Sequence, residues 1–296
     1  MSDSGEEWQV ARRRKGHGRR SHPLQVSLPP GCHQEQQLDI GKTVKRIRDT
    51  VTELRCEDFC QKWKESVAAS VSAALMRVDQ GDCEVSTNQP EDGKDGIISE
   101  QLQCVCYGLG PFSSCVSARY QLAMLLLLLD ARQILLKDCS VYDPAFSSGE
   151  KDVLREMGLT VLTENEEGKH LVTKPTIFYM MHCGKALYNN LLWKNWSTQC
   201  LPLMVIVGNS FCSMRDRTID RVFKQDYSYI SQVVAVCEEK PLPCPSRLID
   251  VFSDTAVITF LSGNLNKLPQ STWADPLEPQ YQNSPDLEII LRDKDR

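Results

Sequence analysis

Each of five short apolar runs in the middle of this chain is followed by small or hydrogen-bonding residues. If the runs are parallel strands, their carboxyl ends meet at one rim of a sheet, where open α/β sheets bind their ligands. We therefore predict a ligand site at this rim. Its six candidate residues, in chain order, are Gly108, Gly110, Asp143, Glu164, His182 and Asn209.

The turn after the first run has the composition of an anion-binding loop. Gly108 and Gly110 let the backbone approach a ligand closely, and the helix that follows supplies backbone N–H groups with partial positive charge. The match to the dinucleotide fingerprint G-x-G-x-x-G is incomplete, because Ser113 occupies the third glycine position. A tight strand-to-helix turn explains the same residues, so both interpretations stand.

Asp143 and His182 are the candidates for recognition and catalysis. An acid at the end of the second strand commonly accepts hydrogen bonds from a ribose, although Asp143-Pro144 is also a frequent turn sequence. An imidazole is the commonest general acid or base, so His182 is the catalytic candidate, with a buried hydrogen-bonding role as the alternative. Cys183 is not expected to be its nucleophile, because adjacent side chains of a strand point to opposite faces.

The elements that would position these residues alternate along the chain. Short apolar runs predict strands, and the longer stretches between them have the periodicity of helices. This alternation is typical of a doubly wound, mostly parallel, Rossmann-like α/β sheet covered by helices. The predicted strands are 102–107, 140–142, 160–162, 176–180, 203–207 and 256–260, and the predicted crossover helices are 116–136, 148–157, 185–196 and 218–236.

Composition divides the whole chain into segments. Residues 1–37 are polar with clustered cations, which predicts a disordered basic arm, and residues 38–79 carry apolar residues at helical spacing, which predicts amphipathic helices. Residues 80–100 are rich in acids and contain glycine and proline, so we expect an acidic linker. The α/β domain then spans 101–268, and the proline-rich residues 269–296 are expected to form an extended tail.

Charge and apolar content exclude several classes of protein. The formal net charge is −5, which argues against a general nucleic-acid binder, but residues 9–22 hold six Lys or Arg and no acid. This part of the arm can serve nuclear import or weak nucleic-acid contact, or can be only a solvated tail. The longest apolar run, 122–129, has eight residues, whereas a bilayer-spanning helix needs roughly 20. No membrane segment is therefore expected.

The thirteen cysteines predict a reducing compartment. Their number is odd, they include no CxxC pair, and the amino-terminal residues lack the apolar stretch of a secretory signal. Such cysteines are expected to be reduced and to pack as small apolar residues, which favours the cytoplasm, with the nucleus as the alternative. Metal sites need paired ligands at short spacing, and because the sequence has no such pair, no metal site is predicted.

Seven segments of unusual composition occur in order between residues 101 and 268. They are Tyr107-Gly-Leu-Gly, Ala118-Arg-Tyr-Gln-Leu-Ala, Asp143-Pro144, Thr176-Ile-Phe-Tyr-Met-Met-His-Cys, Leu187-Tyr-Asn-Asn-Leu-Leu-Trp, Gly208-Asn-Ser-Phe and Asp250-Val-Phe-Ser-Asp-Thr. Together these segments resemble the Sensitivity to Red Light Reduced (SRR-like) domain family. One position departs from the family pattern, because Met181 stands where a proline is expected before His182.

This resemblance implies a regulatory process rather than a defined reaction. Members of the family are associated with circadian rhythm (clock gene expression) and with the regulation of haem biosynthesis, so protein partners are expected. The alternative is a nucleotide- or S-adenosylmethionine-dependent enzyme, similar to a methyltransferase, that uses the cleft at the strand ends. No complete catalytic motif decides between them. The expected ligand is small and either anionic or nucleoside-containing, and the candidate cofactors are a nucleotide, S-adenosylmethionine and haem.

Overall fold

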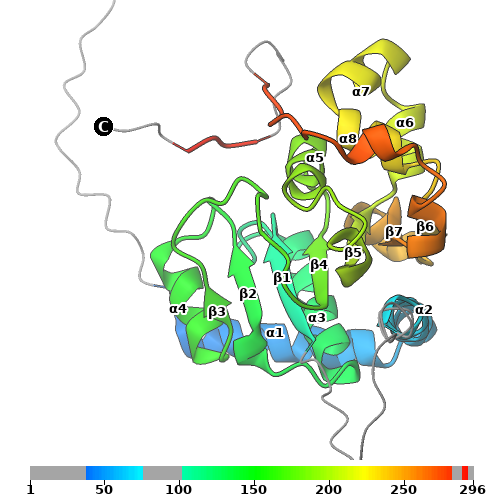
Figure 1. Ribbon diagram of the computed structural model, residues 1–296. Coiled ribbons are helices and arrows are strands. Elements are labelled where there is room, and N and C mark those ends of the chain that lie inside the picture. The colour runs from blue at the N-terminus through cyan, green and yellow to red at the C-terminus, as the bar shows by residue number, and fades with distance from the viewer. Residues whose placement is uncertain (1–37, 76–101, 282–288, 293–296) are drawn as a thin grey trace, which may run out of the picture. The chain divides into compact units, whose positions relative to one another are not determined.

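A seven-stranded sheet forms the centre of the protein (Figure 1). The structure is a computed structural model and describes residues 38–75, 102–281 and 289–292, so the predicted basic arm and acidic linker lie outside the described residues. The strand order is β3-β2-β1-β4-β5-β7-β6, and neighbouring strands from β3 to β5 are parallel. The strands are β1 (Gln103–Tyr107), β2 (Cys139–Tyr142), β3 (Thr160–Val161), β4 (Thr176–Met180), β5 (Met204–Asn209), β6 (Glu238–Pro241) and β7 (Thr255–Thr259).

The predicted α/β class with a mostly parallel sheet is confirmed, with differences at one edge of the sheet. Each of the six predicted strands corresponds to a strand of the structure. The sequence does not predict β6, because Glu-Glu-Lys-Pro has no apolar alternation and its last two residues are exposed. The last strand, β7, runs antiparallel to both β5 and β6.

Successive residues of the central strands enter two different cores. Cys104 and Cys106 of β1 belong to one core, whereas Val105 and Tyr107 belong to the other. This follows from the period of two in a strand, where neighbouring side chains point to opposite faces. Both faces are buried, which is why the strands are continuous apolar runs and why helices cover both sides.

The helices over one face include the amino-terminal pair of helices. Asp39 caps the first of them by accepting a hydrogen bond from the Lys42 backbone N–H at 2.9 Å. In the second, Trp63 donates its indole N–H to the Pro243 carbonyl at 2.8 Å and packs edge-on against Phe252. These helices therefore share one core with the sheet. The helices of this face are α1 (Ile40–Arg55), α2 (Asp58–Leu75), α3 (Val116–Ala131), α4 (Ser148–Glu156) and α9 (Ile249–Phe252).

The helices over the other face are shorter than predicted. The single helix expected over 218–236 is two helices, because Tyr227 between them leaves the helical region with φ −123° and ψ 47°. A further short helix over 211–216 is not predicted by the sequence. The helices of this face are α5 (Lys185–Lys194), α6 (Phe211–Asp216), α7 (Asp220–Asp226), α8 (Ser228–Val233) and α10 (Ser262–Leu265).

The leucine-rich run lies in α3, which is buried on most sides. Its residues belong to the core beneath α1 and α2, and the side chains of 122–125 are at most 1% exposed. Within the described ranges, no helix is both long enough and apolar enough to span a membrane.

Candidate functional site

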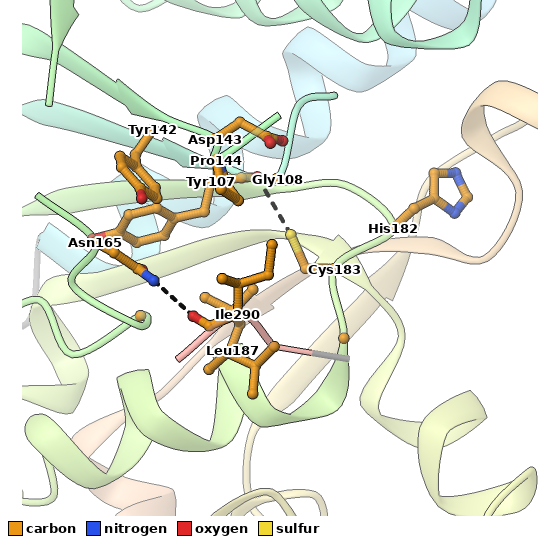
Figure 2. A pocket seen from close by; sticks show the side chains of 13 residues that line it. Tyr107, Gly108, Tyr142, Asp143, Pro144, Asn165, His182, Cys183, Leu187 and Ile290 are labelled. Atoms are coloured by element: carbon orange, nitrogen blue, oxygen red, sulfur yellow. Dashed lines mark hydrogen bonds between the residues drawn. The ribbon is translucent and has the colours of Figure 1, made fainter. Parts of the chain in front are cut away.

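A cavity of about 370 Å³ opens at the carboxyl ends of β1, β2 and β4 (Figure 2). The strand order reverses here, because β1 leads to α3 on one face of the sheet and β4 leads to α5 on the other, so the segments that follow them separate. We call this space the switch-point cavity. Its lining residues are Tyr107, Gly108, Tyr142, Asp143, Pro144, Asn165, Gly168, His182, Cys183, Gly184, Leu187, Ile289 and Ile290.

Two tyrosines form an aromatic part of the lining. Tyr107 and Tyr142 are the last residues of neighbouring strands and are partners in the sheet register. The Tyr107 hydroxyl donates to the Glu166 carboxylate, whose Oε2 lies 3.0 Å from Nδ1 of His170. Burial raises the pKa of Tyr107, so its phenol stays neutral, and the hydrogen bond with His170 lowers the pKa of Glu166. The Tyr107 ring is thereby held in place by a charged acceptor.

Asp143 joins the loop after β1 to the loop after β2. Its side chain is buried, its Oδ2 accepts from the Gly110 backbone N–H at 2.7 Å, and its Oδ1 accepts from Ala145 N–H at 2.7 Å. An ionised carboxylate offers about four acceptor positions. Each oxygen of Asp143 therefore keeps acceptor capacity for a hydroxyl group in the cavity.

Gly108 and Cys183 bring the loop after β1 against the turn after β4. Gly108 has φ 65°, and a Cβ atom at this position would lie 2.5 Å from the Cys183 sulfur. The Cys183 thiol donates to the Tyr107 carbonyl at 3.3 Å. Burial, with a smaller contribution from the Asp143 charge, raises the pKa of this thiol. Cys183 is thus a protonated packing group rather than a nucleophile.

His182 is exposed, and its ring is directed away from the other labelled residues of the cavity (Figure 2). Its backbone is left-handed, with φ 50°, and its Nε2 lies 3.0 Å from the Val251 carbonyl oxygen. A carbonyl only accepts, so Nε2 carries the proton and the acceptor lone pair of a neutral ring is on Nδ1. The Val251 carbonyl therefore holds the His182 ring through Nε2–H, and Nδ1 is left as the acceptor nitrogen of the ring.

The carboxyl-terminal segment supplies another part of the lining. Asn165 donates its side-chain N–H to the Ile290 carbonyl at 2.6 Å, as the dashed line in Figure 2 shows. The Arg292 backbone N–H donates to the Glu167 carboxylate at 2.5 Å, and Ile289 is only 9% exposed. Segment 289–292 therefore packs against the loop between β3 and β4.

The structure brings some of the predicted site residues together and separates others. Gly108, Asp143 and His182 line the switch-point cavity. Asn209, the last residue of β5, lies with His182 in a neighbouring cavity. Gly110 and Glu164 line neither of these two cavities. The Gly110 N–H is bound to the Asp143 carboxylate. Glu164 is exposed, with its carboxylate 3.5 Å from the Arg292 guanidinium.

The residues predicted from the sequence for the ligand site do not include the two tyrosines, Asn165, Leu187 or the isoleucines of the switch-point cavity. The tyrosines had a usable signal, because each is the final residue of a strand that leads to the rim. Ile289 and Ile290 had no such signal, since they follow no strand and reach the cavity only through the tertiary fold. In the described part of the chain, no three His, Cys, Asp or Glu side chains gather as metal ligands.

A doubly wound sheet with a cavity at its switch point defines this chain as a Rossmann-like α/β protein. The chain belongs to the SRR1 domain family, whose model matches residues 89–259, so the family resemblance of its sequence segments is confirmed.

Relatives from animals and a plant share this similarity. The mouse SRR1-like protein is 40% identical over 230 residues, which cover 75% of this chain and 90% of that protein. The Drosophila melanogaster SRR1-like protein is 28% identical over 268 residues, covering 88% and 84% of the two chains. The Arabidopsis thaliana Protein SENSITIVITY TO RED LIGHT REDUCED 1 is 32% identical over 153 residues, covering 52% of each chain.

Proposed function

We propose that this chain is a regulatory protein whose action depends on a nucleoside-containing small molecule held in the switch-point cavity. The name of the Arabidopsis relative refers to sensitivity to red light, which supports a role in regulation. The processes that the family resemblance implies are circadian rhythm and the regulation of haem biosynthesis, carried out with protein partners. The observation that carries the ligand proposal is the combination of Tyr107, Tyr142 and Asp143 in one cavity.

The lining of this cavity suits a base and a ribose. Aromatic rings stack on nucleobases, and the side chains of Leu187 and Ile290 add apolar surface. Asp143 supplies acceptors for ribose hydroxyl groups, as the acid after the second strand does in related α/β sites. The volume of about 370 Å³ falls within the range of about 300 to 1,000 Å³ that small-molecule sites occupy.

Charge in the switch-point cavity favours a nucleoside over a polyphosphate. Among the described residues that line it, Asp143 is an acid and none is Lys or Arg. Triphosphates and diphosphates are held by cations, glycine-rich backbone or both. The loop after β1 provides glycines, but the Gly110 N–H is already bound to Asp143. A neutral or cationic nucleoside therefore suits this lining better than ATP.

Methyl transfer from S-adenosylmethionine is the second candidate function. In the dinucleotide-binding order 3-2-1-4-5-6 the last strands follow the chain order. Here a reversed β7 lies between β5 and β6, which is the arrangement of Rossmann-like S-adenosylmethionine-dependent methyltransferases. Nδ1 of His182 would then be the group that accepts a proton from the molecule to be methylated.

Haem is a poorer match to the same cavity. Haem iron takes His, Cys, Met or Tyr as axial ligand. Of these groups in the described lining, the His182 ring is directed away, the Cys183 thiol is protonated, and the Tyr107 hydroxyl is bound to Glu166. The pKa of Tyr142 is raised by burial and by the Asp143 charge, which disfavours the phenolate form that would bind iron. A role in haem biosynthesis would therefore be regulatory, without haem in this cavity.

Ligand binding tests the proposal. Isothermal titration of the purified chain with adenosine, S-adenosylmethionine, S-adenosylhomocysteine and ATP is expected to show binding of the nucleosides and not of ATP. Tyr142→Ala should weaken binding about fivefold to a hundredfold, since stacking of a base on an aromatic ring contributes about 1–3 kcal/mol. Tyr120→Ala is the matched control, because this partly buried tyrosine of α3 lies outside the cavity.

The pattern of affinities separates the candidates. Equal binding of adenosine and the two sulfur-containing nucleosides supports a nucleoside-responsive regulator. Tenfold tighter binding of S-adenosylmethionine and S-adenosylhomocysteine supports methyl transfer. If no nucleoside binds to a sample shown by mass spectrometry to carry no copurified ligand, the proposal is wrong.

We also propose that the protein is present in both the cytoplasm and the nucleus, and the basic arm supports this. Its cluster Arg12, Arg13, Arg14 and Lys15 has the composition of a nuclear-import signal. Replacing these four residues by Gln should lower the nuclear fraction of a fluorescently labelled chain, and an unchanged fraction would contradict this role.

A further inference from the structure

Residues 269–281, which we call the tail segment, follow the last strand of the sheet and run along α8 and α5 (Figure 1). We propose that the surface beneath them is a docking site for a peptide of a protein partner, and that the tail segment occupies it in competition with that peptide. The inference goes beyond the nucleoside site and does not use the switch-point cavity. The residues of this tail-binding face are Lys169, Asn189, Asn190, Trp193, Trp196 and Tyr229.

Two tryptophans of the tail-binding face donate to carbonyl groups of the tail segment. Nε1 of Trp196 donates to the Thr272 carbonyl at 2.7 Å, and Nε1 of Trp193 donates to the Pro276 carbonyl at 3.1 Å. A proline has no backbone N–H but keeps its carbonyl, so indole donors suit a segment that contains prolines. Proline-rich peptides bind to aromatic surfaces, because their restricted backbone loses little entropy on binding.

The middle of the tail segment is held by its main chain and not by its side chains. The Tyr229 hydroxyl donates to the Leu277 carbonyl at 2.6 Å, yet Leu277 is 82% exposed. Residues 274–278 are all exposed. A segment that only completed the core would bury its leucine. The tail segment therefore lies on α5 and α8 as a bound peptide does.

Two aromatic residues anchor the ends of the tail segment. The Trp273 ring lies 5.2 Å from the Trp196 ring, measured between ring centres. Tyr281 is only 7% exposed, and its hydroxyl accepts from Nδ2 of Asn189 at 3.0 Å and donates to Oδ1 of Asn190 at 2.9 Å. Buried aromatic anchors supply much of the affinity of peptide and protein interfaces. The tail-binding face thus requires an aromatic residue before the proline and a tyrosine after it.

Lys169 gives the bound peptide an acidic position. Its Nζ lies 2.6 Å from the Glu278 carboxylate of the tail segment and 2.6 Å from the Glu167 carboxylate. The Lys169 side chain is 27% exposed, so salt screens this pair less than a fully exposed one. The partner peptide that fits this face therefore has an aromatic residue, a proline, an acid and a tyrosine, in that order.

Competition with the tail segment gives the docking site a distinctive response to mutation. A tethered segment has a high effective concentration at its own site. A peptide in solution therefore binds with an affinity reduced by the fraction of chains whose tail has left the face. Weakening the tail should tighten the binding of this peptide, whereas weakening the face should loosen it. A permanent part of the fold would show neither effect.

The experiment measures binding of a fluorescein-labelled peptide to the full-length chain by fluorescence polarisation. The peptide has the sequence of residues 269–281, which contains each feature that the face requires. The tail variants are Trp273→Ala, which removes the ring beside Trp196, and Glu278→Gln, which removes the acid beside Lys169. The face variant is Tyr229→Phe, which keeps the ring and loses the donor to the tail carbonyl.

Each variant has a control of the same kind. Leu277→Ala changes an exposed side chain of the tail segment, and Tyr120→Phe removes a hydroxyl that donates to Glu53 on α1. A second peptide, in which alanine replaces Trp273 and Tyr281, tests the two anchors. Circular dichroism of every variant checks that the chain is folded.

We expect saturable binding that becomes about tenfold tighter in Trp273→Ala and about threefold tighter in Glu278→Gln, as expected for the loss of an aromatic pair and of a partly exposed ion pair in the tail. Tyr229→Phe should weaken binding about threefold to tenfold, the loss typical of one neutral hydrogen bond. The controls should change the affinity less than about twofold, and the peptide without anchors should not bind.

Three results would overturn the docking site. The first is no saturable binding to any variant, and the second is tail variants that bind the peptide no more tightly than the wild-type chain. The third is a dimer of the wild-type chain in size-exclusion chromatography that the added peptide dissociates, because the occupant would then be the tail of a second copy.

The isothermal titration with nucleosides separates this inference from the proposed function. If the peptide binds with the expected pattern but no nucleoside binds, the docking site stands and the proposed nucleoside site fails. If adenosine binds and the peptide does not, only the tail-binding face is wrongly assigned.

Discussion

The close approach of Gly108 to Cys183 predicts how a single methyl group would change stability. In Gly108→Ala the new Cβ would lie 2.5 Å from the Cys183 sulfur, well inside an ordinary contact of about 3.5–4.0 Å. Overpacking of this kind costs about 1–3 kcal/mol. The left-handed backbone at φ 65° costs a residue other than glycine about another 1–2 kcal/mol. The free energy of unfolding should fall by about 2–5 kcal/mol.

A second substitution separates the two contributions. In a Cys183→Ala background the nearest atom is the residue 183 Cβ at 3.9 Å, which is an ordinary contact. Only the backbone contribution then remains, so Gly108→Ala should cost about 1–2 kcal/mol in this background. The difference between the backgrounds, about 1–3 kcal/mol, measures the steric contact itself.

Urea unfolding followed by circular dichroism measures the four free energies of this cycle. Gly263→Ala is the control, because this exposed helical glycine has nothing within 4 Å of the new Cβ. It should change stability by less than about 1 kcal/mol, in the stabilising direction. If Gly108→Ala costs the same with and without the Cys183 sulfur, the two loops are not in contact at the floor of the switch-point cavity.

The remaining predictions concern two carboxylates near this cavity. Asp143→Ala removes the acceptor of two backbone N–H groups, and each charge-assisted hydrogen bond contributes about 1.5–3 kcal/mol. The free energy of unfolding should therefore fall by about 3 kcal/mol or more in the urea assay. The control Asp152→Ala, on the exposed face of α4, should change it by less than about 0.5 kcal/mol. Glu166 has a lowered pKa because of its hydrogen bond with His170, so it stabilises the fold above the ordinary carboxyl range and this contribution is lost as the pH falls through the lowered value. Glu166→Gln should therefore reduce the loss of stability between pH 7 and pH 3, whereas Glu65→Gln on α2 should not, and an unchanged acid response would show that the pair has no role in stability.

Most of the fold could be predicted from apolar runs, because the central strands are buried on both faces. β4 and β7 are buried throughout, and such runs are visible in the sequence without knowledge of the partners. The direction of β7 could not be predicted, since a fully buried strand is equally apolar in both orientations. Its direction is seen only in the pairing with its neighbours β5 and β6, which is a tertiary property.

The candidate site could be predicted where a residue directly follows a strand. Asp143 and His182 reach the rim for this reason, although Asp143 holds two loops together as well as facing the cavity. Glu164 follows β3 at the edge of the sheet, and the loop there carries its side chain into solvent near Arg292. Ile290 could not be predicted, because its place depends on a contact with Asn165 from a distant part of the sequence.

The position of the carboxyl-terminal segment has a consequence for the synthesis of the protein. The amino terminus of a chain leaves the ribosome first, and domains begin to fold while the rest of the chain is being synthesised. Every strand of the sheet ends at or before Thr259, whereas Ile289 and Ile290 lie further along the chain. The sheet can therefore begin to form before the last part of the cavity lining has emerged from the ribosome. A chain that stops before Ile289 would keep every strand of the sheet and lose this contribution to the cavity, so tight binding at the switch point would distinguish chains that contain this segment from chains that lack it.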